Sequence, residues 1–281
     1  MGLALCERPH MRSALSTRRG GFMNKRIFAA IGTVILGAGL IAGIGSYVAA
    51  AKNDSGHIEA SAAGTYTAPD GKSYPHYTLN LNTYPNALFG GHHGKDGAHP
   101  DWVSYGAAGP NGEVLEDAEA GTNYIVPAHS AVTITVWQYD SGETLNNDFF
   151  AHVRGTVDGT AKFVKRYDVT KKENVTPEET ITDIPTDMVG HTFTIHGMSD
   201  DQDQVFLNVP LMLADDNEVT AAEEEGGYTN FPTKTTFTFI TGDAGEYIWN
   251  CEFPCGDGTI ARFGNAMSTM GFMSGHFTVK G

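Results

Sequence analysis

The feature that most constrains the fold is a series of short segments, all beyond residue 76, in which apolar and polar residues alternate. The clearest cover residues 77–81, 131–137 and 235–240, and a period of two places every second side chain on one face of a strand. Shorter strand-like runs lie at 124–126, 191–195, 205–209, 247–249 and 276–279. Gly, Pro and Asn-Asp clusters separate these runs, and no long amphipathic helical pattern competes with them. The pattern predicts an all-β, antiparallel sandwich or barrel.

The N-terminal segment has a different composition. Residues 1–26 contain six basic side chains and one acidic side chain, and residues 27–51 contain no charged side chain. The uncharged run is as long as the ~20 residues that a helix needs to cross a bilayer, and it exceeds the ~7–15-residue apolar core of a cleaved signal. We expect a transmembrane anchor at 27–51, with a signal sequence cleaved after Val48-Ala-Ala50 as the alternative.

The charge flanking this run sets the expected orientation. Basic residues before it favour a cytoplasmic N-terminus, so that everything after Lys52 faces outward. Residues 1–26 are then a cytoplasmic segment or, because Met23 is a plausible start, partly a mis-annotated extension. The expectation is a single-pass protein of the cell membrane with an extracytoplasmic C-terminal domain, which would be secreted if the signal is cleaved.

The outward part divides by composition into a stalk and one domain. Residues 52–75 are rich in Ala, Gly, Ser and Thr, which is typical of a flexible linker. The strand pattern fills 76–281, which we expect to be a single domain. The acidic stretch at 214–227 interrupts the pattern and is expected to be a solvated insertion, a loop with room for one helical turn.

Net charge limits the partners. The chain has 18 Lys and Arg against 33 Asp and Glu, and the part after residue 51 keeps 12 of the basic and 32 of the acidic side chains, a net charge of −20. Such a field repels phosphate backbones, so nucleic acid is excluded as a partner. The same field could steer a basic partner such as a c-type cytochrome, although solubility alone also explains an acidic surface.

The C-terminal region gathers sulfur donors. Cys251 and Cys255 lie four residues apart, and Met267, Met270 and Met273 follow at intervals of three. Thiolate and thioether ligands select copper, especially when an imidazole joins them. His191 opens the predicted strand 191–195 and could supply that imidazole.

The other histidines have simpler interpretations. His92, His93 and His99 lie in a Gly-rich loop that could chelate a divalent metal, but no rigid element or acidic partner supports a specific site there. The remaining candidates, His129, His152 and His196, are single imidazoles beside apolar residues, for which a structural role is the default.

The order of these segments resembles a cupredoxin domain, a Greek-key β-sandwich or barrel. Within that superfamily, the last ninety residues or so resemble the extracytoplasmic domain of cytochrome c oxidase subunit II. That family binds the dinuclear copper centre CuA through a strand-opening His and a Cys-x3-Cys-Gly-x2-His-x2-Met loop. The resemblance implies that His191 is the first imidazole ligand, Cys251 and Cys255 the bridging thiolates, Phe253 the carbonyl donor and Met273 the thioether.

The loop also departs from the family pattern. Met270 stands where the family has its second His, and the stretch 257–269 is much longer than its counterpart. An altered CuA site, a mononuclear His/Cys/Met centre and a Cu(I) site that uses the methionines all remain open. So does a disulfide between the two cysteines, since extracytoplasmic cysteines usually pair and the methionines would then be packing residues.

These observations favour a membrane-anchored, extracytoplasmic, cupredoxin-like protein that binds one or two copper ions and transfers electrons. A c-type cytochrome or a terminal oxidase is the expected redox partner, and the membrane is contacted through the N-terminal helix. One alternative is a Cu(I) trafficking protein or metallochaperone that uses the Cys/Met cluster, and another is a metal-free, disulfide-closed module. An enzyme is not expected, because no second cluster of histidines is present to activate a substrate.

Overall fold

The computed structural model describes residues 30–35, 37, 57–85, 102–115, 122–141, 147–197, 207–253 and 265–281. The chain divides into two units, Met1–Lys52 and Asn53–Gly281. The described residues of the first unit are helical. Within the described ranges no helix is long and apolar enough to cross a membrane. Most of the anchor expected at 27–51 lies outside these ranges, so the anchor stays a prediction.

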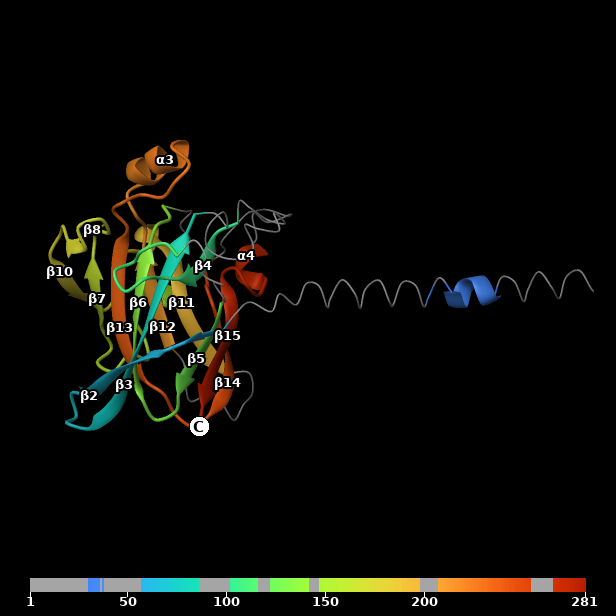
Figure 1. Cartoon of the computed structure of the whole chain (residues 1–281), viewed down its shortest axis with the longest axis horizontal. Helices are drawn as coiled ribbons and strands as arrows, with labels where there is room; N and C mark the ends of the chain where they lie inside the picture. Colours follow the sequence, from blue (N-terminus) through green and yellow to red (C-terminus); the bar gives the residue numbers. More distant parts are fainter. Residues whose placement is uncertain are drawn as a thin grey trace, which may run out of the picture. The chain divides into compact units, whose positions relative to one another are not determined.

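The second unit is a sandwich of two main β-sheets, with a small hairpin beside them (Figure 1). The described strands of the first sheet are, in spatial order, β1 (His57–Glu59), β5 (Asn123–Pro127), β15 (Ser274–Lys280), β14 (Gly245–Asn250), β11 (Val189–Gly197) and β12 (Leu207–Met212). Those of the second sheet are β10 (Glu178–Ile181), β7 (Ala161–Val164), β13 (Thr233–Ile240), β6 (Ala131–Gln138), β3 (Ser73–Tyr84) and β2 (Ser61–Thr67), with β4 (Ser104–Ala107) also paired to β3. The hairpin is β8 (Tyr167–Asp168) and β9 (Glu173–Asn174). Short 3-10 turns are η1 (Phe149–Ala151) and η2 (Thr186–Met188), and the helices of this unit are α3 (Asp216–Glu224) and α4 (Asn265–Ser268).

The core lies between the two main sheets, where buried side chains from both sheets meet. Ile134 of β6, Phe237 of β13, and Phe193 and Trp249 of the opposite sheet belong to one buried cluster. The Phe193 and Trp249 rings stack with centroids 5.1 Å apart, and burying each such side chain stabilises the fold by about 1.5–3 kcal/mol. This packing holds β11 and β14 side by side, which fixes the two strands that carry the candidate ligands.

The eight segments expected to be strands are confirmed, with only 207–209 of the run 205–209 among the described residues. The antiparallel expectation is confirmed only in part. The pairs β3·β6, β5·β15 and β1·β5 are parallel, whereas the other described pairs are antiparallel. A parallel pair needs a crossover connection. Between β3 and β6 the chain first forms β4, which pairs with β3 in the same sheet, and then β5 in the opposite sheet.

The region 52–75, expected to be a flexible stalk, contains two β-strands, β1 and β2. β1 pairs with β5 and β2 pairs with β3, so the chain is already part of both sheets from residue 57. The physical reason is that the outer backbone groups of β3 and β5 would otherwise stay unpaired at a sheet edge. The Tyr66 ring also packs against His76, with centroids 5.6 Å apart. Residues 57–59 and 61–67 therefore form edge strands here.

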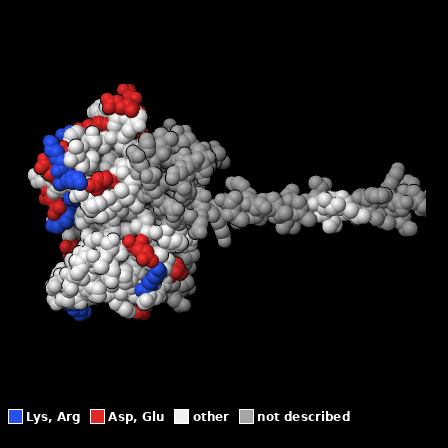
Figure 2. Space-filling model, in the orientation of Figure 1, with Lys and Arg blue, Asp and Glu red and all other residues white. Residues whose placement is uncertain are grey.

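The acidic insertion at 214–227 contains α3, which is longer than the single turn expected. The Asp215 carboxylate accepts hydrogen bonds from the backbone N–H groups of Asn217 (3.1 Å) and Glu218 (3.3 Å), which makes Asp215 an N-cap. Asp216 and Glu218 in the first turn complement the helix dipole, and the buried Val219 attaches the helix to the domain. Acidic side chains therefore gather over α3 at this end of the domain (Figure 2).

Candidate metal site

His191 lies near the start of β11, where the strand is irregular. The pairing of β11 with β12 shifts register between Val189 and His191, and such a bulge re-aims the side chains that follow it. The His191 side chain is 3% exposed, so its imidazole lies inside the domain.

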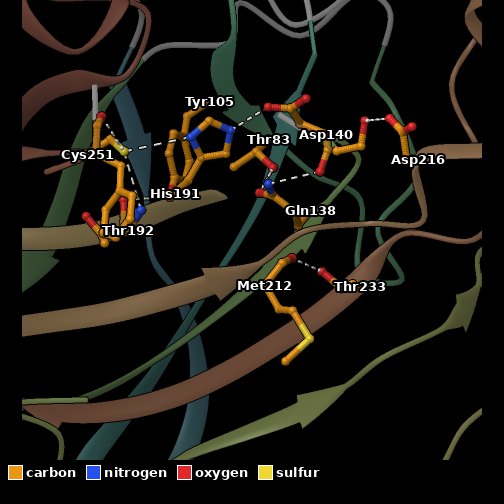
Figure 3. A network of polar contacts seen from close by, with 12 residues as sticks. Thr83, Tyr105, Gln138, Asp140, His191, Thr192, Met212, Asp216, Thr233 and Cys251 are labelled. Carbon is orange, nitrogen blue, oxygen red and sulfur yellow. Dashed lines mark hydrogen bonds and ion pairs between the residues drawn. The ribbon is translucent and has the colours of Figure 1, made fainter. Parts of the chain in front are cut away.

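Cys251 follows β14 directly and lies beside His191. The pairing of Thr194 with Asn250 aligns the two strands here. The Cys251 Sγ lies 3.8 Å from Nδ1 of His191, and the backbone N–H of Thr192 donates a hydrogen bond to the same sulfur at 3.4 Å (Figure 3). The thiol and one imidazole nitrogen therefore face each other in a buried position.

Two further candidate ligands, Phe253 and Met273, lie next to Cys251. The carbonyl oxygen of Phe253 is 3.4 Å from the Cys251 Sγ, and the Cys251 N–H donates to the carbonyl oxygen of Met273 at 2.9 Å. Met273 is fully buried, whereas Met270 is partly buried and its Sδ accepts a hydrogen bond from Ser274 Oγ at 3.9 Å. The side chains of His191 and Cys251 thus face each other, whereas Phe253 and Met273 approach Cys251 through their backbone carbonyl oxygens. Met270 lies three residues before Met273.

Four of the candidate residues belong to ranges that the structure does not describe. Cys255 lies outside the described residues, as do the histidines of the Gly-rich loop, His92, His93 and His99. Within the described part of the chain, no three His, Cys, Asp or Glu side chains come together in a metal-binding group. The ligand roles therefore stay predictions, and His191 and Cys251 are the candidate ligands whose side chains are seen to face each other.

Sequence reasoning missed Asp140, which completes the site. This residue follows β6, and its Oδ2 lies 2.6 Å from Nε2 of His191 (Figure 3). Its side chain is 6% exposed, and its carbonyl oxygen accepts hydrogen bonds from Gln138 Nε2 (3.2 Å) and from the N–H of Ala214 (3.1 Å). The sequence marks Asp140 only as a carboxylate that follows β6, a largely buried strand.

This environment changes the protonation of His191. Burial by itself lowers the pKa of the imidazole, but the hydrogen bonds to Asp140 and then Cys251 outweigh burial and raise the pKa from 6.5 to about 10. The contact with the Asp140 carboxylate therefore favours the protonated imidazole in the metal-free protein. A metal ion at Nδ1 must displace a proton.

We expect the metal-free protein to lose stability as the pH rises from ~6.5, the pKa of an unfolded His, towards 10. A pKa that is higher in the folded state contributes stability fully below the unfolded value, and that contribution disappears as the pH passes the folded value. Urea unfolding of the wild type and of His191→Gln at a series of pH values measures the difference. A pH dependence that is the same in both proteins would contradict the assignment.

The other described histidines lie apart from this pair. His196, on the same strand, has a side chain 42% exposed and contacts Asn250 Oδ1 at 2.5 Å and Glu252 Oε1 at 3.4 Å. The Nε2 of His129 lies 3.1 Å from Oδ1 of Asp243 at the surface. His191 is therefore distinguished by its burial and by its contact with Cys251.

The pair fits a copper ion chemically. Bonds of ~2.0 Å to an imidazole nitrogen and ~2.3 Å to a thiolate together exceed the 3.8 Å between the two atoms, so one ion can reach both. The contact of Nε2 with Asp140 leaves Nδ1 as the nitrogen for the metal, and the Thr192 N–H stabilises negative charge on the sulfur. Imidazole with thiolate is a donor pair of copper sites.

No protein-family model matches the sequence, and no curated protein sequence matches it. Among solved structures, rusticyanin from Thiobacillus ferrooxidans matches with a TM-score of 0.33 and 13% identity, over 73% of this chain and 77% of that one. Auracyanin B matches with a TM-score of 0.26 and 13% identity, over 79% and 98%. Scores this low carry no argument, so the two-sheet β-sandwich rests on the strand pairing described above.

Proposed function

We propose that this protein is a cupredoxin-like copper protein that transfers electrons. One observation supports the proposal most strongly. The Sγ of Cys251 and the Nδ1 of His191 are 3.8 Å apart in a buried position, where β11 lies beside the end of β14 in the β-sandwich. A buried thiol facing an imidazole can hold copper without exposing it to solvent.

The surrounding residues suit an electron carrier. Bound copper would supply reversible one-electron exchange. Cys251 and His191 would hold the ion, and the aromatic core around Trp249 would keep both strands still, which limits the movement needed when the charge changes. The Thr192 N–H would hold the Cys251 sulfur in place and share its charge. No group in this arrangement has to activate a substrate.

The remaining ligands are proposed from the resemblance. Met273 is the proposed thioether ligand, and its backbone carbonyl oxygen accepts a hydrogen bond from the Cys251 N–H. Phe253 is the proposed carbonyl donor. Met270 takes the position of the family's second His, and Cys255 would complete a dinuclear site. Without Cys255 as a ligand, the same residues would form a mononuclear centre.

The proposed setting is the outer face of a membrane, with the domain attached through residues 27–51. The carboxylates of α3 lie at one end of the sandwich and offer a surface to a basic redox partner such as a c-type cytochrome, or to a terminal oxidase (Figure 2). Long-range attraction of this kind raises association rates and weakens with salt.

Cu(I) trafficking is the second candidate. The observation that favours it is the partial exposure of Met267 and Met270, beside the buried Met273. Partly exposed thioethers could pass Cu(I) to another protein, whereas an electron carrier keeps its ion. A metal-free module closed by a Cys251–Cys255 disulfide is the third candidate.

Anaerobic copper titration of the full chain, with an optical spectrum and a thiol count, separates the three candidates. An electron carrier is expected to bind copper tightly and to develop an intense thiolate-to-copper charge-transfer band on oxidation. Binding of Cu(I) alone, without colour after oxidation, would favour trafficking. If the thiols are blocked before reduction and no copper is retained afterwards, the copper proposal fails.

A further inference from the structure

We infer that Asp140 is a positioning residue that orients His191 and sets the reduction potential of the copper site. This inference rests on the proposed function. The evidence is the contact between two buried side chains, Asp140 Oδ2 and His191 Nε2, at 2.6 Å. They come from opposite sheets, 51 residues apart in the sequence, so the contact depends on the complete fold.

The contact selects one nitrogen of the imidazole. A carboxylate accepts hydrogen bonds, so Nε2 of His191 must carry a proton to donate to it. The other nitrogen, Nδ1, is the one that faces the Cys251 sulfur at 3.8 Å. Asp140 therefore presents Nδ1 to the metal and holds the ring plane (Figure 3).

Asp140 is itself held by the fold. Its carbonyl oxygen accepts from Gln138 Nε2 and from the backbone N–H of Ala214, just before α3. The next residue, Ser141, donates from Oγ to Asp216 Oδ1 at 2.9 Å. The backbone at Asp140 is thus held by β6 on one side and by the segment that leads into α3 on the other.

The negative charge of Asp140 sets the direction of the effect. A carboxylate bonded to Nε2 makes the imidazole a stronger donor, which stabilises Cu(II) more than Cu(I). The site would otherwise favour Cu(I), because its expected thioether ligands are soft. Asp140 would therefore lower the reduction potential that the sulfur ligands raise.

The test is redox titration of the copper-loaded full chain in Asp140→Asn, which keeps the shape of the side chain and removes its charge. We expect a loss of about 10–100-fold in the affinity for Cu(II) relative to Cu(I), which corresponds to a potential about 60–120 mV higher for a one-electron couple. Asp243→Asn, the same change at an exposed carboxylate that has no contact with Asp140 or His191 among the described residues, is the matched control and should leave the potential close to that of the wild type. Equal potentials in Asp140→Asn and Asp243→Asn would overturn the inference.

A measurement on the wild type decides the matter if Asp140→Asn does not fold. Long-range proton–nitrogen NMR of the Cu(I)-loaded full chain is expected to show the His191 proton on Nε2, and a proton on Nδ1 would overturn the inference. Failure of the wild type to bind copper is a separate result, which would remove the proposed function and this inference with it. Copper binding by the wild type together with a proton on Nδ1 would remove the inference alone.

Discussion

Replacing Cys251 with serine is expected to abolish tight copper binding and the charge-transfer band of the oxidised protein. The thiolate is the metal ligand with the strongest preference for copper, and in this structure its sulfur lies 3.8 Å from Nδ1 of His191. Serine keeps a small side chain that the Thr192 N–H can still contact, but its oxygen is a poor ligand for Cu(I). The loss should exceed the roughly 10–100-fold that removal of an outer hydrogen-bond partner costs.

His196→Gln is the control for this experiment. It removes a second imidazole from the same strand, β11, at a position where the side chain is partly exposed and contacts Asn250 and Glu252. We expect this variant to bind copper as the wild type does. Unchanged copper stoichiometry and colour in Cys251→Ser would show that the thiol is not a ligand.

Gly275→Ala is expected to destabilise the domain by about 2–6 kcal/mol. Gly275 lies on β15 opposite Trp249, and a Cβ there would be 1.8 Å from the carbonyl oxygen of Thr122 and 2.8 Å from the indole nitrogen of Trp249. The indole N–H donates to that same carbonyl at 2.6 Å. The methyl group must therefore both overpack the core, at about 1–3 kcal/mol, and break a buried hydrogen bond, at about 1–3 kcal/mol.

Urea unfolding of Gly275→Ala and Gly242→Ala measures this effect. A Cβ at Gly242 meets no heavy atom within 4 Å, so this control should unfold close to the wild type. Because Trp249 lies two residues before Cys251, we also expect Gly275→Ala to weaken copper binding. A loss of stability no larger than that of Gly242→Ala would contradict the packing described for β14 and β15.

The central strands could be predicted from the sequence because their burial is one-sided and repeats every second residue. Residues 131–137 and 235–240 carry this signal clearly, and both lie in strands of the second sheet. The edge strands β1 and β2 consist largely of small and polar residues, and their order comes from backbone pairing with β5 and β3. No pattern of side chains records such pairing. The same holds for the parallel pairing of β3 with β6.

Part of the candidate site could likewise be predicted from the sequence, and part could not. His191 and Cys251 could be named from their residue types and their places at a strand start and a strand end, and the structure brings them together. Asp140 could not be named, because its role depends on a contact across 51 residues of chain and on the way the two sheets face each other. The helix α3 could have been predicted from the sequence. Asp215 precedes a run rich in Ala and Glu, and an Asp before such a run is a signal for the start of a helix.

X-ray absorption at the copper edge, on the copper-loaded full chain, tests the central claim most directly. The proposed site predicts a sulfur scatterer at about 2.3 Å together with an imidazole nitrogen at about 2.0 Å, from Cys251 and His191. A copper shell of nitrogen and oxygen atoms alone, without sulfur, would contradict the account.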